Sequence, residues 1–264
     1  MLYTEINSNP IVFLKDKIQV HIFNSREDMG KKAAEDTAAK IKEILQEKNE
    51  VNMIFAAAPS QNEFLKYLVN DLSIPWEKIN AFHMDEYIGL SANAPQGFGN
   101  FLKERLFEKV PFKSVQYING LVEDIQVECD RYEKLLMDYP VDIVCLGIGE
   151  NGHIAFNDPP VADFNDKVLV KEVELDPSCR QQQVNENCFT SIDLVPLKAI
   201  TLTIPALMKA KYMFCVVPSA NKAKAVYETL HHKISEKYPA TILRTKEDMK
   251  LYLDKDSASL LIYQ

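Results

Sequence analysis

Short apolar runs alternate with longer amphipathic segments along most of the sequence, and this alternation limits the folds open to the chain more than any other feature. The runs typical of strands buried on both faces are Ile18–Phe23, Val51–Ala58, Ile79–Met84, Val141–Leu146 and Tyr212–Val217. The segments between them carry apolar residues at helical spacing. Such an alternation predicts an α/β fold, with a mostly parallel central sheet and helices on both of its faces.

The remaining elements follow from weaker signals. Further strands are expected at Val115–Ile118, Val168–Val173, Ala199–Thr203 and Ser259–Tyr263. Ser25 begins a helix as a capping residue, and Asp176 followed by Pro177 begins another. The chain contains no internal repeat, low-complexity tract or Gly/Ser-rich linker, so residues 1–264 are predicted to form a single domain.

The charge and the cysteines exclude several partners and compartments. A net charge of −8 would repel the phosphates of nucleic acid or of an anionic membrane. The five cysteines are scattered without a C-x-x-C pair, as is usual in a reducing compartment. The N-terminus lacks the pattern of a signal peptide, and every apolar run is far shorter than the ~18 residues of a membrane span. We therefore expect a cytoplasmic protein with no nucleic-acid or membrane partner, and a homo-oligomer is left open.

Ligands of parallel α/β sheets bind beyond the carboxyl ends of the strands, so the segments at 56–61, 83–87, 147–158 and 218–222 are the first candidates for a site. In the third segment, Gly147, Gly149 and Gly152 follow a strand with G-x-G-x-x-G spacing. A dinucleotide-binding turn would continue into a helix, whereas Pro159-Pro160 cannot lie in a helix interior. We therefore expect no dinucleotide, and the glycines are either binding residues or simply what a tight turn requires.

His153 and Asp158 stand directly behind this turn. A lone histidine is more often structural than catalytic. Its position after a glycine-rich turn at a strand end nevertheless favours a catalytic imidazole, which the carboxylate of Asp158 could orient.

The adjacent carboxylates Asp85 and Glu86 form a second candidate group, at the end of the strand Ile79–Met84. A partly desolvated Asp85 could move a proton between neighbouring carbons, although both acids could equally be solvated loop residues. A metal site made from His83, Asp85, His153 and Asp158 is conceivable. It has no supporting spacing such as H-x-x-H, so no metal is expected.

Lys222 is the third candidate, because it stands at the beginning of the helix expected over 221–230. A lysine there adds a point charge to the free N–H groups of a helix N-terminus, which suits a phosphate group. A solvated surface lysine is the other interpretation.

Taken together, these stretches resemble the glucosamine-6-phosphate deaminase/isomerase family, which belongs to a larger group that includes 6-phosphogluconolactonases. The resemblance lies in Met84–Leu90 (MDEYIGL), Gly147–Pro159 (GIGENGHIAFNDP), Ala199–Leu207 (AITLTIPAL) and Asn221–Ala225 (NKAKA), and it covers most of the chain from Ile18 onward. It implies a modified Rossmann-like three-layer sandwich. It also implies a cofactor-free conversion of a hexosamine 6-phosphate into a ketose 6-phosphate and ammonia.

The resemblance also implies roles for individual residues. Asp85 would carry the proton between C2 and C1 of the opened sugar, and His153 would open the ring. The two acidic residues that flank the family's histidine correspond here to Asn151 and Asp158, and Asn151 cannot supply the negative charge of an aspartate. Lys222 would bind the phosphate.

The phosphate site departs further from the family pattern. The family's threonine- and glycine-rich loop is replaced by 56–61, where Ser60 and Gln61 are the remaining side-chain donors. The family's phosphate-binding arginine has no match, since Arg180 precedes the expected position and Gln183 occupies it. The candidate binding residues are Ser60, Gln61, Glu86, Gly149, Gly152, Arg180 and Lys222.

Two other functions share parts of the pattern. The 6-phosphogluconolactonases resemble G-x-G-x-D-G-H-x-A-S-L-F-P, but this chain reads IAFNDP from Ile154 and carries MDEY, which favours the deaminase. A sugar-phosphate-sensing domain of a transcriptional regulator shares the architecture. No basic helix-turn-helix precedes Ile18, which disfavours that class. The expected partner is therefore a small-molecule sugar phosphate.

Overall fold

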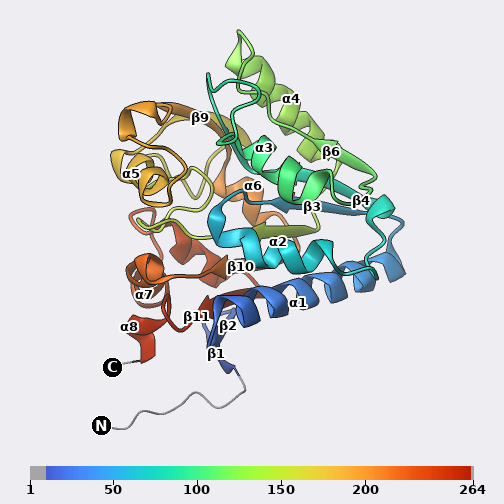
Figure 1. Ribbon diagram of the computed structural model, residues 1–264, viewed down its shortest axis with the longest axis vertical. Coiled ribbons are helices and arrows are strands. Elements are labelled where there is room, and N and C mark those ends of the chain that lie inside the picture. The colour runs from blue at the N-terminus through green and yellow to red at the C-terminus, as the bar shows by residue number, and fades with distance from the viewer. Residues whose placement is uncertain (1–9, 263–264) are drawn as a thin grey trace.

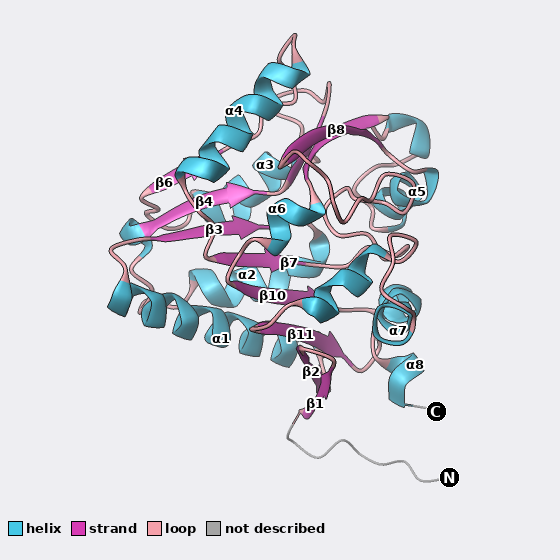
Figure 2. Ribbon diagram, turned by 180° about the vertical axis from the view of Figure 1, so that it is seen from behind, coloured by secondary structure: helices cyan, strands magenta, loops and turns pink. Residues whose placement is uncertain are grey.

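The computed structural model describes residues 10–262, and its main sheet has eight strands (Figures 1 and 2). Their bounds are β1 (Ile11–Lys15), β2 (Ile18–Phe23), β3 (Val51–Phe55), β4 (Ile79–His83), β6 (Ser114–Gln116), β7 (Ile143–Leu146), β10 (Tyr212–Val217) and β11 (Met249–Asp254). The strand order is β1-β2-β11-β10-β7-β3-β4-β6. The hairpin β1–β2 is antiparallel, and every other pairing in this sheet is parallel.

A small antiparallel sheet lies beyond the carboxyl end of β4. It has the order β5-β9-β8, with the bounds β5 (Asp85–Tyr87), β8 (Val170–Glu174) and β9 (Lys198–Leu202). Because β5 begins one residue after Met84, the chain passes from the main sheet into the small sheet at Asp85.

Helices cover both faces of the main sheet, which makes three layers (Figures 1 and 2). Helices α1 (Arg26–Glu47), α2 (Asn62–Val69) and α3 (Phe98–Leu102) pack on one face. Helices α4 (Ile125–Asp138), α6 (Ile204–Met208) and α7 (Ala223–His231) pack on the other. Helix α5 (Pro177–Asn185) lies beyond the carboxyl ends of the central strands, and α8 (Ser259–Ile262) follows β11.

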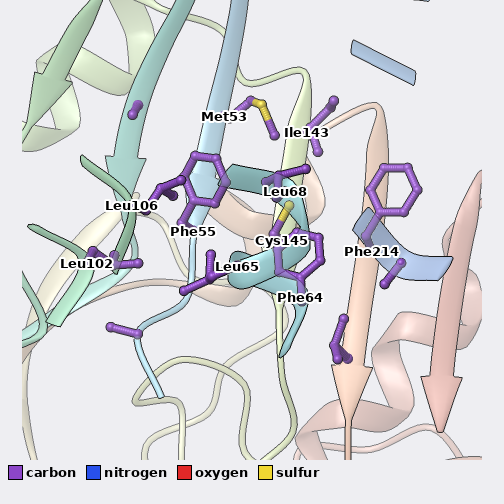
Figure 3. Close-up of a cluster of buried hydrophobic side chains, with 14 of the residues drawn as sticks. Met53, Phe55, Phe64, Leu65, Leu68, Leu102, Leu106, Ile143, Cys145 and Phe214 are labelled. Atoms are coloured by element: carbon purple, nitrogen blue, oxygen red, sulfur yellow. The ribbon is translucent and has the colours of Figure 1, made fainter. Parts of the chain in front are cut away.

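The central strands place successive side chains in two separate cores, as the alternation of a strand requires. Met53 and Phe55 of β3 join the core beneath α1 and α2, whereas Ile54 joins the core on the opposite face. Figure 3 shows Phe64 and Leu65 of α2 directed at the side chains of the first core. Each fully buried side chain of this size contributes about 1.5–3 kcal/mol to folding. This packing holds the carboxyl ends of the central strands in place.

The predicted fold class is confirmed: the structure is an α/β sandwich around a mostly parallel sheet. The predicted strand Ser259–Tyr263 is wrong, because Ser259–Ile262 is helical and Tyr263 lies outside the described residues. Strand β11 was not expected, since Lys250 interrupts its apolar run. In the fold, the Lys250 ammonium lies 3.0 Å from the Asp36 carboxylate on α1, which allows a lysine to stand within a central strand.

The five cysteines are free thiols. Across residues 10–262, no helix combines the length and the apolar character needed to cross a membrane.

Candidate active site

A pocket opens at the carboxyl ends of β3, β4, β7 and β10, where the sequence predicted a site. The candidate residues that line it are Ser60, Asp85, Gly149, His153 and Lys222. Gln182 and Gln183 of α5 complete its wall. Four loops that are distant in sequence thus meet at one edge of the sheet.

His153, Asp158 and Asn151 form a hydrogen-bonded group behind the turn that follows β7. The Nδ1 atom of His153 lies 2.9 Å from Oδ1 of Asp158 and 2.7 Å from Oδ1 of Asn151. The amide nitrogen of Asn151 donates in turn to the same Asp158 oxygen at 2.8 Å. Since both neighbours of Nδ1 are acceptors, Nδ1 carries a proton, and Nε2 is the ring nitrogen left for the pocket.

The Asp158 carboxyl is buried, and its burial opposes ionisation. The charge of His153 and hydrogen bonds from His153 and Asn151 outweigh that effect and hold the pKa of Asp158 below its usual range. Asp158 is therefore an ionised acceptor for the imidazole N–H, an arrangement that fixes both the tautomer and the ring orientation.

The imidazole of His153 packs directly on the backbone of Gly149. A Cβ atom at position 149 would lie only 2.1 Å from Cε1 and 2.3 Å from Nε2 of that ring. Gly152 has φ +83°, and its N–H donates to the Gly149 carbonyl at 3.0 Å, which closes the turn. The glycine spacing therefore makes room for an imidazole.

We expect Gly149→Ala to lower kcat/KM about a hundredfold, because a misplacement of about 1 Å in a reacting group has an effect of that size. The measurement is steady-state kinetics on folded protein, with Gly89→Ala as the control. Unlike Gly149, Gly89 has a positive φ, and a Cβ atom there meets nothing within 4 Å. If Gly89→Ala loses as much activity as Gly149→Ala, the contact with the imidazole does not explain the loss.

Asp85 stands at the junction of the two sheets and is almost fully buried. Within residues 10–262 no hydrogen bond to its carboxylate contributes to its ionisation, and the side chain lines the pocket. Burial raises the pKa of Asp85 well above its usual range, and repulsion from Glu86 adds to the effect. A carboxylate that has no partner and is costly to ionise is suited to accept a proton.

His83 holds the backbone of Asp85 in place. Its Nε2 atom accepts from the Ile118 N–H at 2.9 Å, so Nδ1 carries the proton and donates to the Asp85 carbonyl at 2.9 Å. The ring is completely buried, and burial lowers the pKa of His83 to about 4. The sequence placed His83 only in a conceivable metal site, whereas the structure shows a neutral imidazole that joins two backbone segments.

This histidine predicts a pH-dependent stability. Because its pKa falls from 6.5 in the unfolded chain to about 4 in the folded one, the unfolded state takes up a proton first on acidification. The wild type should therefore lose about 3 kcal/mol of unfolding free energy between pH 6.5 and pH 4 through this group. His83→Asn should lack that part of the dependence in urea titrations, whereas the exposed His231→Asn should keep it. Parallel curves for wild type and His83→Asn would contradict the assignment.

Besides Gly152, which closes the turn, three candidate binding residues lie outside the pocket wall. Glu86 instead accepts the backbone N–H groups of Tyr87, Phe98 and Gly99, and so ties the start of α3 to β5. Gln61 donates to the Val216 carbonyl at 3.1 Å and links the loop after β3 to β10.

Arg180 is the third, and its guanidinium turns away from the pocket. It donates to the carbonyls of Ile192 and Val195, at 2.6 and 2.9 Å for its NH2 group. The prediction that it binds phosphate is corrected accordingly, because these contacts direct the positive charge toward the segment that follows α5. Gln183, which occupies the position expected for the family's arginine, does line the pocket.

Lys222 lines the pocket but is not free. Its ammonium lies 2.9 Å from a carboxylate oxygen of Glu186, and both side chains are largely buried. No sequence signal singled out Glu186 or Gln182. Their involvement depends on how α5 folds back over the sheet.

Cys179 joins His153 and Asp158 in a buried group whose potential ligand atoms lie within 4.8 Å of one another. Burial and the nearby Asp158 charge raise the pKa of Cys179 well above its usual range. A protonated thiol and a hydrogen-bonded imidazole nitrogen are poor metal ligands, so the donor set does not fit a bound metal ion.

A pocket at the carboxyl ends of parallel strands, holding an unpaired carboxylate and an imidazole–carboxylate pair, is typical of α/β enzymes that move protons on a small substrate. Residues 24–252 match the family described as glucosamine-6-phosphate isomerases/6-phosphogluconolactonase. The chain belongs to this family, and the resemblance drawn from its motifs is confirmed.

Individual relatives lie on the deaminase side of the family. The chain is 35% identical over 212 residues to a glucosamine-6-phosphate deaminase of Listeria monocytogenes, which covers 80% of this chain and 88% of that protein. It is 39% identical over 183 residues to a glucosamine-6-phosphate deaminase of Bacillus cereus, covering 69% and 68% of the two chains.

Solved structures give the same result for the fold. A monomeric glucosamine-6-phosphate deaminase superposes with a TM-score of 0.82 at 31% identity, covering 91% of this chain and 99% of that one. A 6-phosphogluconolactonase from Trypanosoma cruzi has a TM-score of 0.77 at 17% identity, covering 94% and 98%. The second likeness concerns the fold alone.

Proposed function

We propose that this protein is an amino-sugar-6-phosphate deaminase/isomerase, which converts a hexosamine 6-phosphate and water into a ketose 6-phosphate and ammonia. The observation that carries the proposal is the pairing, in one pocket, of the unpartnered Asp85 carboxylate with the oriented imidazole of His153. Family membership and the named deaminases among its relatives support the same reaction.

The geometry suggests a role for each group. Nε2 of His153 takes the proton from the C1 hydroxyl and returns it to the ring oxygen, which breaks the bond between C1 and that oxygen. Asp85 then takes the proton from C2 and delivers it to C1, while one proton passes from the amino nitrogen to the C1 oxygen. The C1 aldehyde thereby becomes a hydroxyl, and the double bond now joins C2 to its nitrogen. Water adds to this C2 imine, and ammonia leaves as the ketone forms. Asp158 holds the imidazole throughout and stabilises its protonated form.

A substrate panel tests the proposal. Gluco- and galacto-configured hexosamine 6-phosphates would be assayed for ammonia and for ketose phosphate, with 6-phosphogluconolactone in parallel. We expect equimolar ammonia and ketose phosphate from at least one hexosamine. Hydrolysis of the lactone without ammonia release from any hexosamine would replace the deaminase assignment with a lactonase.

A further inference from the structure

The ion pair between Lys222 and Glu186 occupies the place where the substrate's anionic group is expected. Lys222 ends the short turn η5 (Ala220–Lys222) after β10, and Glu186 directly follows α5. Their charged atoms are 2.9 Å apart, with only 4% and 11% of the side chains exposed. Among the residues that line the pocket within 10–262, Lys222 is the one lysine or arginine. Within residues 10–262, the one lysine or arginine of the pocket wall is therefore already paired with a carboxylate.

The position of the Glu186 carboxylate is set by its surroundings. The side-chain amide of Gln182 donates to the same Glu186 oxygen at 2.9 Å. The amide oxygen of Gln182 accepts the Glu150 N–H, from the turn after β7, at 2.8 Å. Gln182 thus connects the glycine turn to Glu186 and holds the carboxylate against Lys222.

The space around this pair is divided in two. The pocket that contains Asp85 and His153 has a cavity volume of about 60 Å³, whereas ligand pockets usually measure about 300–1,000 Å³. A hollow of about 390 Å³ adjoins it, shares Gln183 and Phe98 with it, and has Glu186 in its wall. Lys222 lines the smaller pocket and Glu186 lines the larger hollow, so their ion pair joins the walls of the two spaces.

A phosphate group that reaches Lys222 meets this carboxylate first. Like charges placed side by side repel each other, and the wall offers no second lysine or arginine within residues 10–262 to hold the second anion. Substrate binding must therefore displace Glu186 from Lys222.

We propose that Glu186 is a built-in competitor for the anionic group of the substrate: its carboxylate binds Lys222 in the empty enzyme, and the phosphate replaces it. This inference rests on the proposed function, in which Lys222 binds a phosphate. Glu186 sets the affinity for phosphate and so discriminates against sugars that lack one, because only an anion can take over its contact.

Calorimetric binding of inorganic phosphate to the full chain tests the competition without using turnover. We expect Glu186→Gln to bind phosphate about tenfold more tightly than wild type, because the amide keeps the shape and removes the charge. The KM for the hexosamine 6-phosphate should fall in parallel. The matched control is Glu228→Gln, which removes a carboxylate 3.8 Å from the exposed Lys224 on the neighbouring helix and should leave the phosphate Kd unchanged.

The variant Lys222→Met shows whether Glu186 affects phosphate binding by competing for Lys222 or through the local structure. If Glu186 acts through Lys222, the tenfold gain should vanish when Glu186→Gln is combined with Lys222→Met. Removing one charge of a buried ion pair can destabilise the fold, so Glu186→Asp serves as a second variant that keeps the charge. Its shorter side chain should hold Lys222 less firmly, and we expect a gain in phosphate affinity between those of wild type and Glu186→Gln.

Three outcomes would decide against the inference: an unchanged phosphate Kd in both Glu186 variants, weaker phosphate binding in Glu186→Gln, or a gain that survives Lys222→Met. The proposed function can fail separately. Suppose that Glu186→Gln binds phosphate more tightly but wild type releases no ammonia from any hexosamine 6-phosphate. That result would support the competition between Glu186 and phosphate and contradict the proposed deaminase activity.

Discussion

Replacing Asp85 by asparagine should abolish turnover and, at neutral pH, raise the melting temperature. A lost general base lowers kcat by about 10²–10⁴-fold, and the loss should fall on kcat rather than on KM, because Asp85 acts on the transition state. Asparagine fills the same space without the charge that burial disfavours.

The stability part of this prediction follows from the raised pKa of Asp85. Above the usual pKa of 3.8, the unfolded chain ionises this carboxyl while the folded chain resists doing so. The unfolding free energy of wild type therefore falls as pH rises from about 4 toward the folded pKa. Asp85→Asn lacks this penalty, so its advantage in melting temperature should grow as the pH rises above about 4. A variant that is less stable than wild type at every pH would contradict the electrostatic account.

Glu86→Gln is the matched control. Glu86 does not line the pocket, so we expect a milder loss of activity than for Asp85→Asn. Repulsion from Glu86 contributes to the raised pKa of Asp85, so the acidic limb of the kcat/KM profile should move to lower pH in Glu86→Gln. An Asp85→Asn variant that retains most of its activity would remove Asp85 from the mechanism.

His153→Gln should have the second large effect, a loss of about 10²–10⁴-fold with the ring-closed sugar. Glutamine cannot cycle a proton between the C1 hydroxyl and the ring oxygen at neutral pH. Asp158→Asn should lose less, because the imidazole remains and only its ionised partner is removed. The pH–rate profile should nevertheless change, since the protonated imidazole then lacks its counter-charge. Coincident profiles of wild type and Asp158→Asn would show that Asp158 does not tune the histidine.

Asp158→Asn and Asp85→Asn should shift stability in opposite directions. The pKa of Asp158 is lowered in the folded protein, so its contribution to stability is present above pH 3.8 and is lost as the pH falls through the folded value. Removing the charge of Asp158 should therefore destabilise the protein at neutral pH. The measurement is the melting temperature of both variants and wild type in the same neutral buffer. We expect it to fall for Asp158→Asn and to rise for Asp85→Asn.

Sequence patterns predicted the central sheet because its signals are local. The strands Ile18–Phe23 and Tyr212–Val217 have the predicted bounds, since continuous apolar runs can only be buried on both faces. The edge strand β1 was missed, because its hydrophobic side chains are largely exposed and follow no buried pattern. Helix α8 was read as a strand, because an apolar run this short does not distinguish the two by periodicity.

The sequence by itself determined the family, the sheet and the short motifs that bring Asp85 and His153 to strand ends, because each of these is written within a few consecutive residues. Only the tertiary structure decided which charges are available there. Arg180 turns to the carbonyls of Ile192 and Val195.

Two further contacts of this kind are the ion pair between Lys222 and Glu186 and the hydrogen bond from the Ile118 N–H to His83. Such contacts join segments that are far apart in the chain, and they depend on how the helices pack against the sheet and on the side-chain rotamers that this packing allows. No local pattern encodes them.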